Sequence, residues 1–181
     1  MFPTQSGFKL IAEEPNVYTF AMHRNVNIYV WVGAARGDIT DRSMQIVAEQ
    51  VPQHPEGLST VHVMTHLAAP PTPEARRGFA KIGERFQSSV ISVSLVIERE
   101  GFWGSAMRSA VTGVQLLMGR ADYPMKVHAS VEETAAWMPT QHAQRSGVRL
   151  DPGEFLTALK SVRAYTVAQC EAHHADLSRS A

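Results

Sequence analysis

Histidine is the residue type in this chain with the widest range of possible chemistry, since eight histidines accompany a single cysteine. His62 and His66 lie four residues apart in the segment His62-Val63-Met64-Thr65-His66. On a helix this spacing would suit zinc, but the β-branched residues in and around the segment indicate a strand. A strand rises ~3.3 Å per residue and would separate the two rings by ~13 Å. Zinc–nitrogen bonds are ~2.1 Å long, so we expect no metal at this pair.

Sequence motifs that would indicate an enzyme are not found. The chain contains no Gly-x-Gly-x-x-Gly, no phosphate-binding loop and no Gly-x-Ser-x-Gly. Cys170 lies in an amphipathic C-terminal segment, which is a poor position for a nucleophile without an assembled pocket. A single cysteine also rules out an intrachain disulfide. We predict a protein that is not an enzyme and needs no cofactor; an enzyme with an unfamiliar site is the alternative.

A more specific set of side chains comes from the alternation of residues along the predicted strands. In residues 26–32 and 60–67, valine and other aliphatic side chains alternate with aromatic, histidine and methionine side chains. The aliphatic sets suit a face packed under helices. The other face then forms a platform that collects Tyr29, Trp31, His62, Met64 and His66, and the alternation in residues 90–98 adds Ser92 and Ser94.

We predict that this platform binds a small ligand or a protein partner through Tyr29, Trp31, His62, Met64 and His66. The alternative is that the platform is simply covered. The N-terminal residues 8–11, the C-terminal helix or a second protomer could each cover it.

Residues 102–118 form a predicted helix with unusually little charge. One stripe of the helix is apolar and fits the core. The remaining surface carries small residues together with Phe102 and Leu116. We predict an oligomer contact through Phe102, Ala106, Ser109, Gly113 and Leu116; burial of the same surface under the C-terminal helix is the alternative.

The elements that position these residues follow the order β-β-α-β-α-β-α-β-α, with one more helix at the C-terminus. The predicted strands are residues 17–23, 26–32, 60–67, 90–98 and 125–129. Alternating strands and helices predict an α/β fold with a mixed, mostly parallel sheet and helices mainly on one face. The helix that follows the strand at residues 125–129 is predicted to end before an irregular segment from Pro139 to Leu150. We therefore predict a domain of residues 1–140, followed by a linker and an appended helix in residues 141–181.

Composition excludes several classes of protein. The 181 residues include 17 Lys+Arg and 17 Asp+Glu, so the formal net charge is +0. Nucleic-acid binders usually carry a basic surplus, which argues against a nucleic-acid partner. Hydrophobic residues make up 44% of the chain, yet no stretch reaches the ~20 apolar residues of a membrane span. We expect a cytoplasmic protein, since the N-terminal residues also lack the pattern of a signal peptide.

Two segments resemble the STAS-like family, which includes sulfate-transporter and anti-sigma-factor-antagonist domains. Residues 25–33, followed by Asp38-Ile39-Thr40, resemble the family's hairpin strand that runs through a glycine into the first helix. Residues 127–138 resemble its closing strand and capped helix in standalone members. The resemblance covers roughly residues 15–140, and it implies the STAS-like order of elements.

The resemblance also implies a regulatory position. Signalling members of the family are phosphorylated on a Ser or Thr at the start of the second helix, and Thr72 is the matching residue here. The residues before it, 67–71, lack the acidic residue and the serine of those members. A plain helix N-cap at Thr72 is the alternative.

These observations lead to two functional expectations. The first is a non-catalytic, homo-oligomeric interaction or regulatory module that acts in bacterial signalling or as a scaffold, with itself and a regulator as protein partners. The second is a domain that binds a small molecule or a lipid on the platform.

Overall fold

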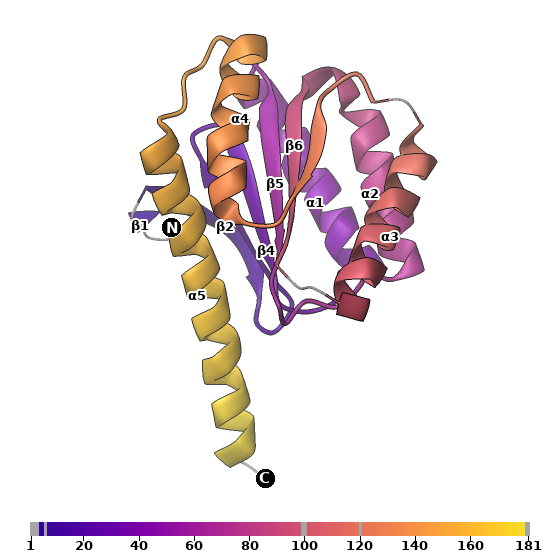
Figure 1. The fold of residues 1–181 in the computed structure, drawn as a ribbon, viewed down its shortest axis with the longest axis vertical. Helices are drawn as coiled ribbons and strands as arrows, with labels where there is room; N and C mark the ends of the chain where they lie inside the picture. The colour runs from indigo at the N-terminus through magenta and orange to yellow at the C-terminus, as the bar shows by residue number, and fades with distance from the viewer. Residues whose placement is uncertain (1–3, 6, 99–100, 120, 180–181) are drawn as a thin grey trace.

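A seven-stranded sheet forms the centre of the molecule in a computed structural model that describes residues 4–5, 7–98, 101–119 and 121–179 (Figure 1). The strands lie in the order of the chain, and the first four pair antiparallel while β4 to β7 pair parallel. Their bounds are Thr4–Gln5 (β1), Phe8–Glu14 (β2), Tyr18–His23 (β3), Val26–Trp31 (β4), Leu58–Met64 (β5), Val90–Ile97 (β6) and Met125–His128 (β7).

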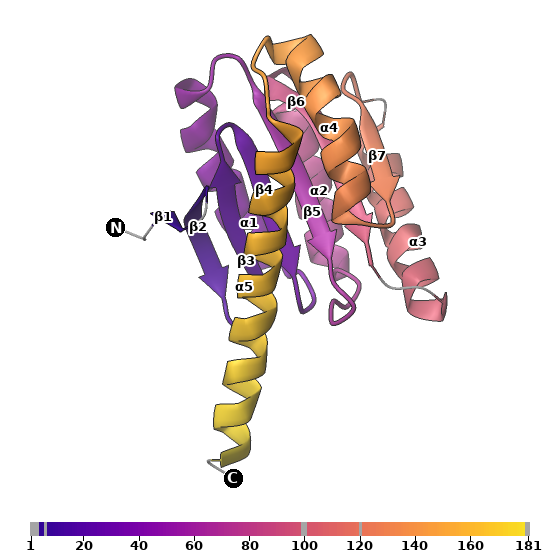
Figure 2. The ribbon, with the colours of Figure 1, turned by 60° about the vertical axis from the view of Figure 1, so that its left-hand side comes forward.

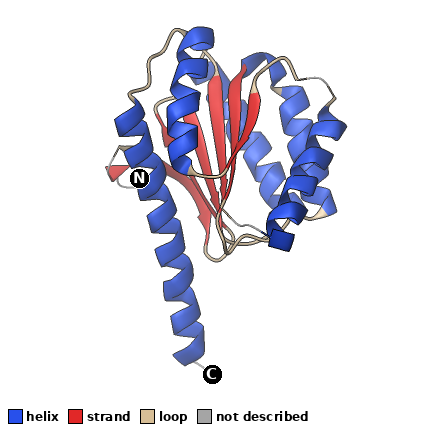
Figure 3. Ribbon diagram, in the orientation of Figure 1, coloured by secondary structure: helices blue, strands red, loops and turns tan. Residues whose placement is uncertain are grey.

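Helices cover both faces of the sheet (Figures 1 and 3). The three crossovers between parallel strands place α1 (Gly37–Gln50), α2 (Pro73–Arg85) and α3 (Gly101–Met118) on one face. This common side is expected from right-handed crossovers without a reversal of strand order. The helices α4 (Val131–Ser146) and α5 (Pro152–Arg179) lie on the other face, and single 3-10 turns span Val51–Gln53 and Gln87–Ser89. The predicted α/β class with a C-terminal helix is confirmed.

The strand β2 was missing from the sequence-based prediction. Phe8 and Leu10 alternate with more exposed residues, as an edge-side strand requires. The register with β3 then shifts between Leu10 and Ala12, so the alternation breaks at Ile11. Such a bulge disrupts the alternation of apolar and polar residues by which a strand is recognised in a sequence. The sheet therefore begins two strands earlier than the sequence indicated.

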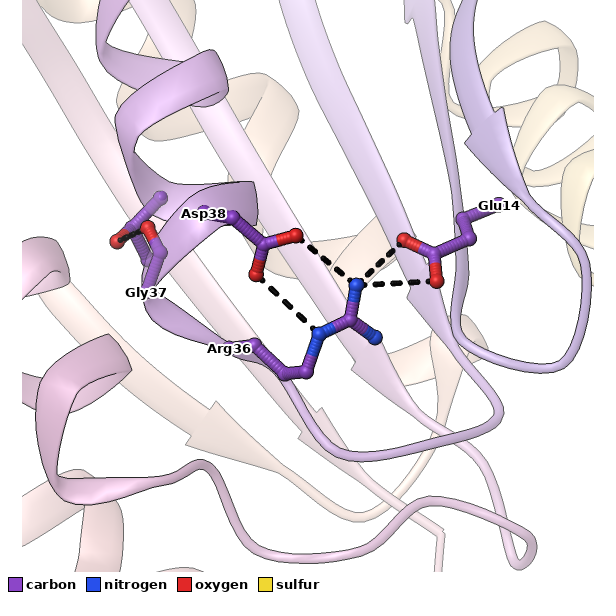
Figure 4. A network of polar contacts seen from close by, with 5 residues as sticks. Glu14, Arg36, Gly37 and Asp38 are labelled. Atoms are coloured by element: carbon purple, nitrogen blue, oxygen red, sulfur yellow. Dashed lines mark hydrogen bonds and ion pairs between the residues drawn. The ribbon is translucent and has the colours of Figure 1, made fainter.

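An ion-pair network fastens the end of β2 to the start of α1 (Figure 4). One guanidinium nitrogen of Arg36 lies 3.0 and 2.9 Å from the two carboxylate oxygens of Glu14. The same side chain contacts Asp38 in the first helical turn at 3.2 and 3.0 Å. Asp38 thus lies inside the first turn of the helix and contacts β2 through Arg36. Arg36 and Glu14 are partly exposed and Asp38 is exposed, so water screens these ion pairs and they stabilise the fold only weakly.

The C-terminal region differs most from the sequence-based prediction. The helix α4 continues through Pro139 to Ser146, although we expected residues 139–150 to be irregular. Met138, Pro139 and His142 are all buried; this packing outweighs the cost of proline inside a helix, about 3 kcal/mol. The expected domain boundary after residue 140 therefore falls within a helix.

The first half of α5 belongs to the same core as the sheet. Phe155, Leu159 and Val162 are 0% exposed and cluster with aliphatic residues of β4 and β5. Arg163 reinforces this docking through two hydrogen bonds to Glu98, at 2.6 and 2.8 Å. The later part of α5 extends beyond the sheet (Figure 2). Residues 141–166 are thus an integral layer of the fold.

Candidate functional site

A cavity of about 150 Å³ lies between the sheet and the layer formed by α1, α2 and α3. Its sheet side is formed by alternate residues of β4, β5 and β6, and its helix side mainly by α2 and α3. No described residue that lines it is an Asp, Glu, Lys or Arg. The principal side chains are Tyr29, Trp31, His62, Met64, Leu95, Phe79, Met107, Ala110, Val111 and Val114.

The sheet side of the cavity is a row of stacked rings. Tyr29 pairs with Phe20 on one neighbouring strand and with His62 on the other. The ring centroids of these two pairs are 4.1 and 4.9 Å apart, and both pairs are stacked. Phe79 of α2 meets His62 and Trp31 edge-on, at 5.5 and 5.9 Å. The stacked rings therefore form a flat aromatic wall along the sheet, and the Phe79 ring packs against this wall edge-on.

Two structural features set the position of α2, which carries Phe79. The Thr72 hydroxyl accepts a hydrogen bond from the Ala75 amide at 3.2 Å, which confirms the predicted N-cap. At Gly78 the helix passes so close to α1 that an added Cβ would lie 2.0 Å from the Thr40 hydroxyl oxygen. Any larger residue at Gly78 would therefore move α2. The phosphoacceptor role of Thr72 stays a prediction.

His62 is uncharged in this environment. Trp31 Nε1, which can only donate, lies 3.3 Å from His62 Nδ1. Nδ1 must therefore accept, and the proton of the neutral ring lies on Nε2. Burial lowers the pKa of His62 from 6.5 to about 4, because the apolar surroundings penalise the charged form.

The tyrosines near the cavity are also neutral. Burial raises the pKa of the Tyr29 hydroxyl, and a hydrogen bond with Ser43 partly opposes the shift. Burial likewise raises the pKa of Tyr123 to about 12. At neutral pH the cavity therefore presents no formal charge from its titratable side chains.

Four of the five platform residues lie together in this cavity: Tyr29, Trp31, His62 and Met64. His66 does not join them, because β5 ends at Met64 and His66 is exposed in the turn that follows. The face itself is covered by α1–α3 of the same chain, and the binding role of these residues stays a prediction.

Ser92 and Ser94 lie on the opposite face of the sheet, contrary to the expectation. Ser94 pairs in register with Val61, and its hydroxyl contacts Thr134 of α4 at 2.8 Å. Val93 and Leu95 of β6 therefore line the cavity, where Leu95 is the neighbour of His62. Both faces of a sheet covered by helices are apolar, so hydrophobicity could not decide which face β6 presents.

Residues of α2 and α3 complete the site, and no pattern in the sequence indicated this. In the sequence, Phe79, Met107 and Val111 fit the apolar, core-facing stripes of their helices. In the structure they also line the cavity.

All five residues predicted for the oligomer contact lie on α3. Phe102, Ser109 and Leu116 are exposed, while Ala106 and Gly113 are half-buried. Phe102 and Leu116 retain 80% and 78% of their surface. The C-terminal helix lies on the other face of the sheet and does not cover them (Figure 1).

A second constellation on the opposite face resembles a Ser-His-Asn triad. Ser59 Oγ lies 2.8 Å from His142 Nδ1, and His142 Nε2 lies 3.0 Å from Asn25 Oδ1. Asn25 Oδ1 can only accept, so the His142 proton lies on Nε2 and Ser59 donates to Nδ1. However, Ser59 and His142 are 0% exposed, and Ser59 Oγ also contacts Ser92 Oγ at 2.9 Å. A nucleophile enclosed in this way cannot reach a substrate, so the network anchors α4 to the sheet.

In the described part of the chain, the remaining chemistry-bearing residues form no further site. Among the described residues, no group of three or more His, Cys, Asp or Glu side chains could hold a metal ion. Burial, with Glu171 nearby, raises the pKa of the Cys170 thiol, which disfavours the nucleophilic thiolate. No helix in the described ranges is long and apolar enough to cross a bilayer.

We compared the chain with models of protein families, with curated proteins and with solved structures, and none of the three comparisons gave a match. The STAS-like relationship therefore stays a prediction from the two segments quoted above.

Proposed function

We propose that this protein binds a small, uncharged, apolar molecule in the cavity under α1–α3. The observation that supports this function is the cavity itself, about 150 Å³ in volume and lined by aromatic and aliphatic side chains. Apolar cavities of this size can stay free of water and bind a molecule such as benzene. An ion would lose its hydration without gaining an opposite charge, so the ligand is neutral.

The proposal predicts binding of a simple aromatic probe. We expect 4-fluorotoluene to bind with a dissociation constant of about 1 mM or lower, measured by ¹⁹F NMR, since few heavy atoms limit the affinity. Ala110→Phe should abolish binding, because Ala110 lies on α3 against the cavity and is only 6% exposed.

The control places the same substitution on an exposed position of α5, Ala168→Phe, which should leave binding unchanged. Circular dichroism and denaturation curves establish that both variants are folded. If wild-type protein does not bind the probe, or if folded Ala110→Phe binds it equally well, the proposed function is wrong.

The exposed surface of α3 favours a second candidate function, homo-oligomerisation as an interaction module. Phe102 and Leu116 are 14 residues apart, about 21 Å along the helix, with Ser109 midway. In an antiparallel two-fold pair, Phe102 of each copy meets Leu116 of the other, and the small central residues let the helices approach. Such self-complementarity is what an isologous dimer requires.

This candidate predicts that analytical ultracentrifugation detects a dimer at about 100 µM protein. A dimer with a binding free energy of about −5.5 kcal/mol has a dissociation constant of about 100 µM. Phe102→Ser with Leu116→Ser should give a monomer, because both large apolar contacts are lost. Leu67→Ser, at an exposed leucine outside α3, is the matched control and should remain dimeric. A monomeric wild type would contradict the candidate.

A further inference from the structure

We infer that His62 selects a ligand with an uncharged hydrogen-bond acceptor, such as the carbonyl oxygen of a compact aryl ketone. This inference rests on the proposed cavity function and specifies the class of ligand. It starts from the tautomer of the ring. Because Trp31 Nε1 donates to Nδ1 at 3.3 Å, the only N–H group of the neutral imidazole is at Nε2.

Nε2 is directed towards the cavity by the geometry of the strand. Side chains on a strand stand roughly perpendicular to the sheet, and His62 belongs to the cavity lining on β5. Nε2 lies at the tip of the ring, farther from the backbone than Nδ1. The stack with Tyr29 at 4.9 Å and the edge of Phe79 at 5.5 Å hold the ring in this orientation.

The Nε2–H group has no hydrogen-bond acceptor among the residues that the structure describes, whereas Nδ1 has Trp31. His62 is only half-buried and lines the cavity, so a ligand in the cavity can reach this N–H group. A ligand oxygen would supply the missing acceptor. A carboxylate would bring an uncompensated charge into the cavity, so a neutral carbonyl, ether or hydroxyl oxygen fits best.

The walls around this donor determine the rest of the ligand. Tyr29, Trp31 and Phe79 present ring faces and edges, which favour an aromatic body. The volume of about 150 Å³ limits that body to roughly one ring with a short substituent. An aryl ketone meets all three conditions: one acceptor, one ring and no charge.

The test compares two probes of nearly equal shape, 4-fluoroacetophenone and 4-fluoro-α-methylstyrene, in which a carbonyl oxygen is replaced by a methylene group. We expect the wild type to bind the ketone about tenfold more tightly, as measured by ¹⁹F NMR titration, which corresponds to one net hydrogen bond. In His62→Phe the ratio should fall to about one, with the hydrocarbon still bound.

His66→Phe is the matched control, because His66 is exposed outside the cavity; its ratio should equal that of the wild type. Equal binding of both probes by the wild type, or an unchanged ratio in His62→Phe, overturns the role of His62 and leaves the cavity function intact. If the wild type binds neither probe, the cavity function itself fails.

A measurement on the unmodified protein avoids dependence on the folding of the variant. Long-range ¹H–¹⁵N spectra of the histidine rings at pH 7 should show His62 as the neutral tautomer protonated at Nε2. A ring protonated at Nδ1, or at both nitrogens, would overturn the inference.

Discussion

Lowering the pH from 7.5 to 5 should reduce the free energy of unfolding by about 4 kcal/mol through two histidines, His62 and His142. The pKa of His62 and that of His142 are each lowered from 6.5 to about 4, in both cases mainly by burial. Below pH 6.5 the unfolded chain binds a proton on each ring, while the folded protein keeps both rings neutral. Stability is therefore fully present above pH 6.5 and is lost as the pH falls towards 4.

Urea denaturation at a series of pH values measures this effect. Each ring contributes about 2 kcal/mol at pH 5, because one pKa unit corresponds to about 1.4 kcal/mol. His62→Phe and His142→Gln should each remove about half of the pH dependence, whatever their effect at pH 7.5. The pKa of His128 is also lowered, mainly by burial, and adds to the loss in the same direction. A flat wild-type profile between pH 7.5 and 5 would contradict histidine rings that stay neutral in the folded protein.

Phe155→Ala should destabilise the protein by about 3–5 kcal/mol, the cost of removing a large aromatic side chain from a packed core. Phe155 is 0% exposed near the start of α5, and its ring lies 6.1 Å from that of His23. Denaturation followed by circular dichroism measures the change.

Lys160→Ala, on the exposed side of the same helix, should change stability by about 0.5 kcal/mol or less, since its ion pair with Glu132 is exposed. The contrast tests whether α5 is an integral layer. A loss below about 1 kcal/mol for Phe155→Ala would show that this helix is an appended element, as the predicted irregular segment before it indicated.

Local signals predicted much of the fold. Thr72 caps the start of α2 and Pro73 is its first residue, as these residue types indicated. The alternation in β4 and β5 also placed Tyr29, Trp31, His62 and Met64 on one face. Each of these features depends on neighbouring residues along the chain, which a sequence displays directly.

The remaining features depend on contacts between distant residues. The helix α4 passes through Pro139 because the sheet packs against Met138 and His142, which no local rule anticipates. The face chosen by Ser92 and Ser94 depends on the register of β6 beside β5. The cavity arises from how far α3 stands from the sheet, so its helix side could not be predicted from an apolar stripe.

The methyl groups of methionine offer the most direct test of ligand binding under α1–α3. Met64, Met107, Met118 and Met125 line the cavity, whereas Met138 is equally apolar and fully buried on the opposite face. In ¹³C-methyl spectra of the wild type, 4-fluoroacetophenone should shift the first four signals at millimolar concentration and leave Met138 unmoved. If the four cavity signals do not move, or if Met138 moves with them, the protein does not bind a ligand in this cavity.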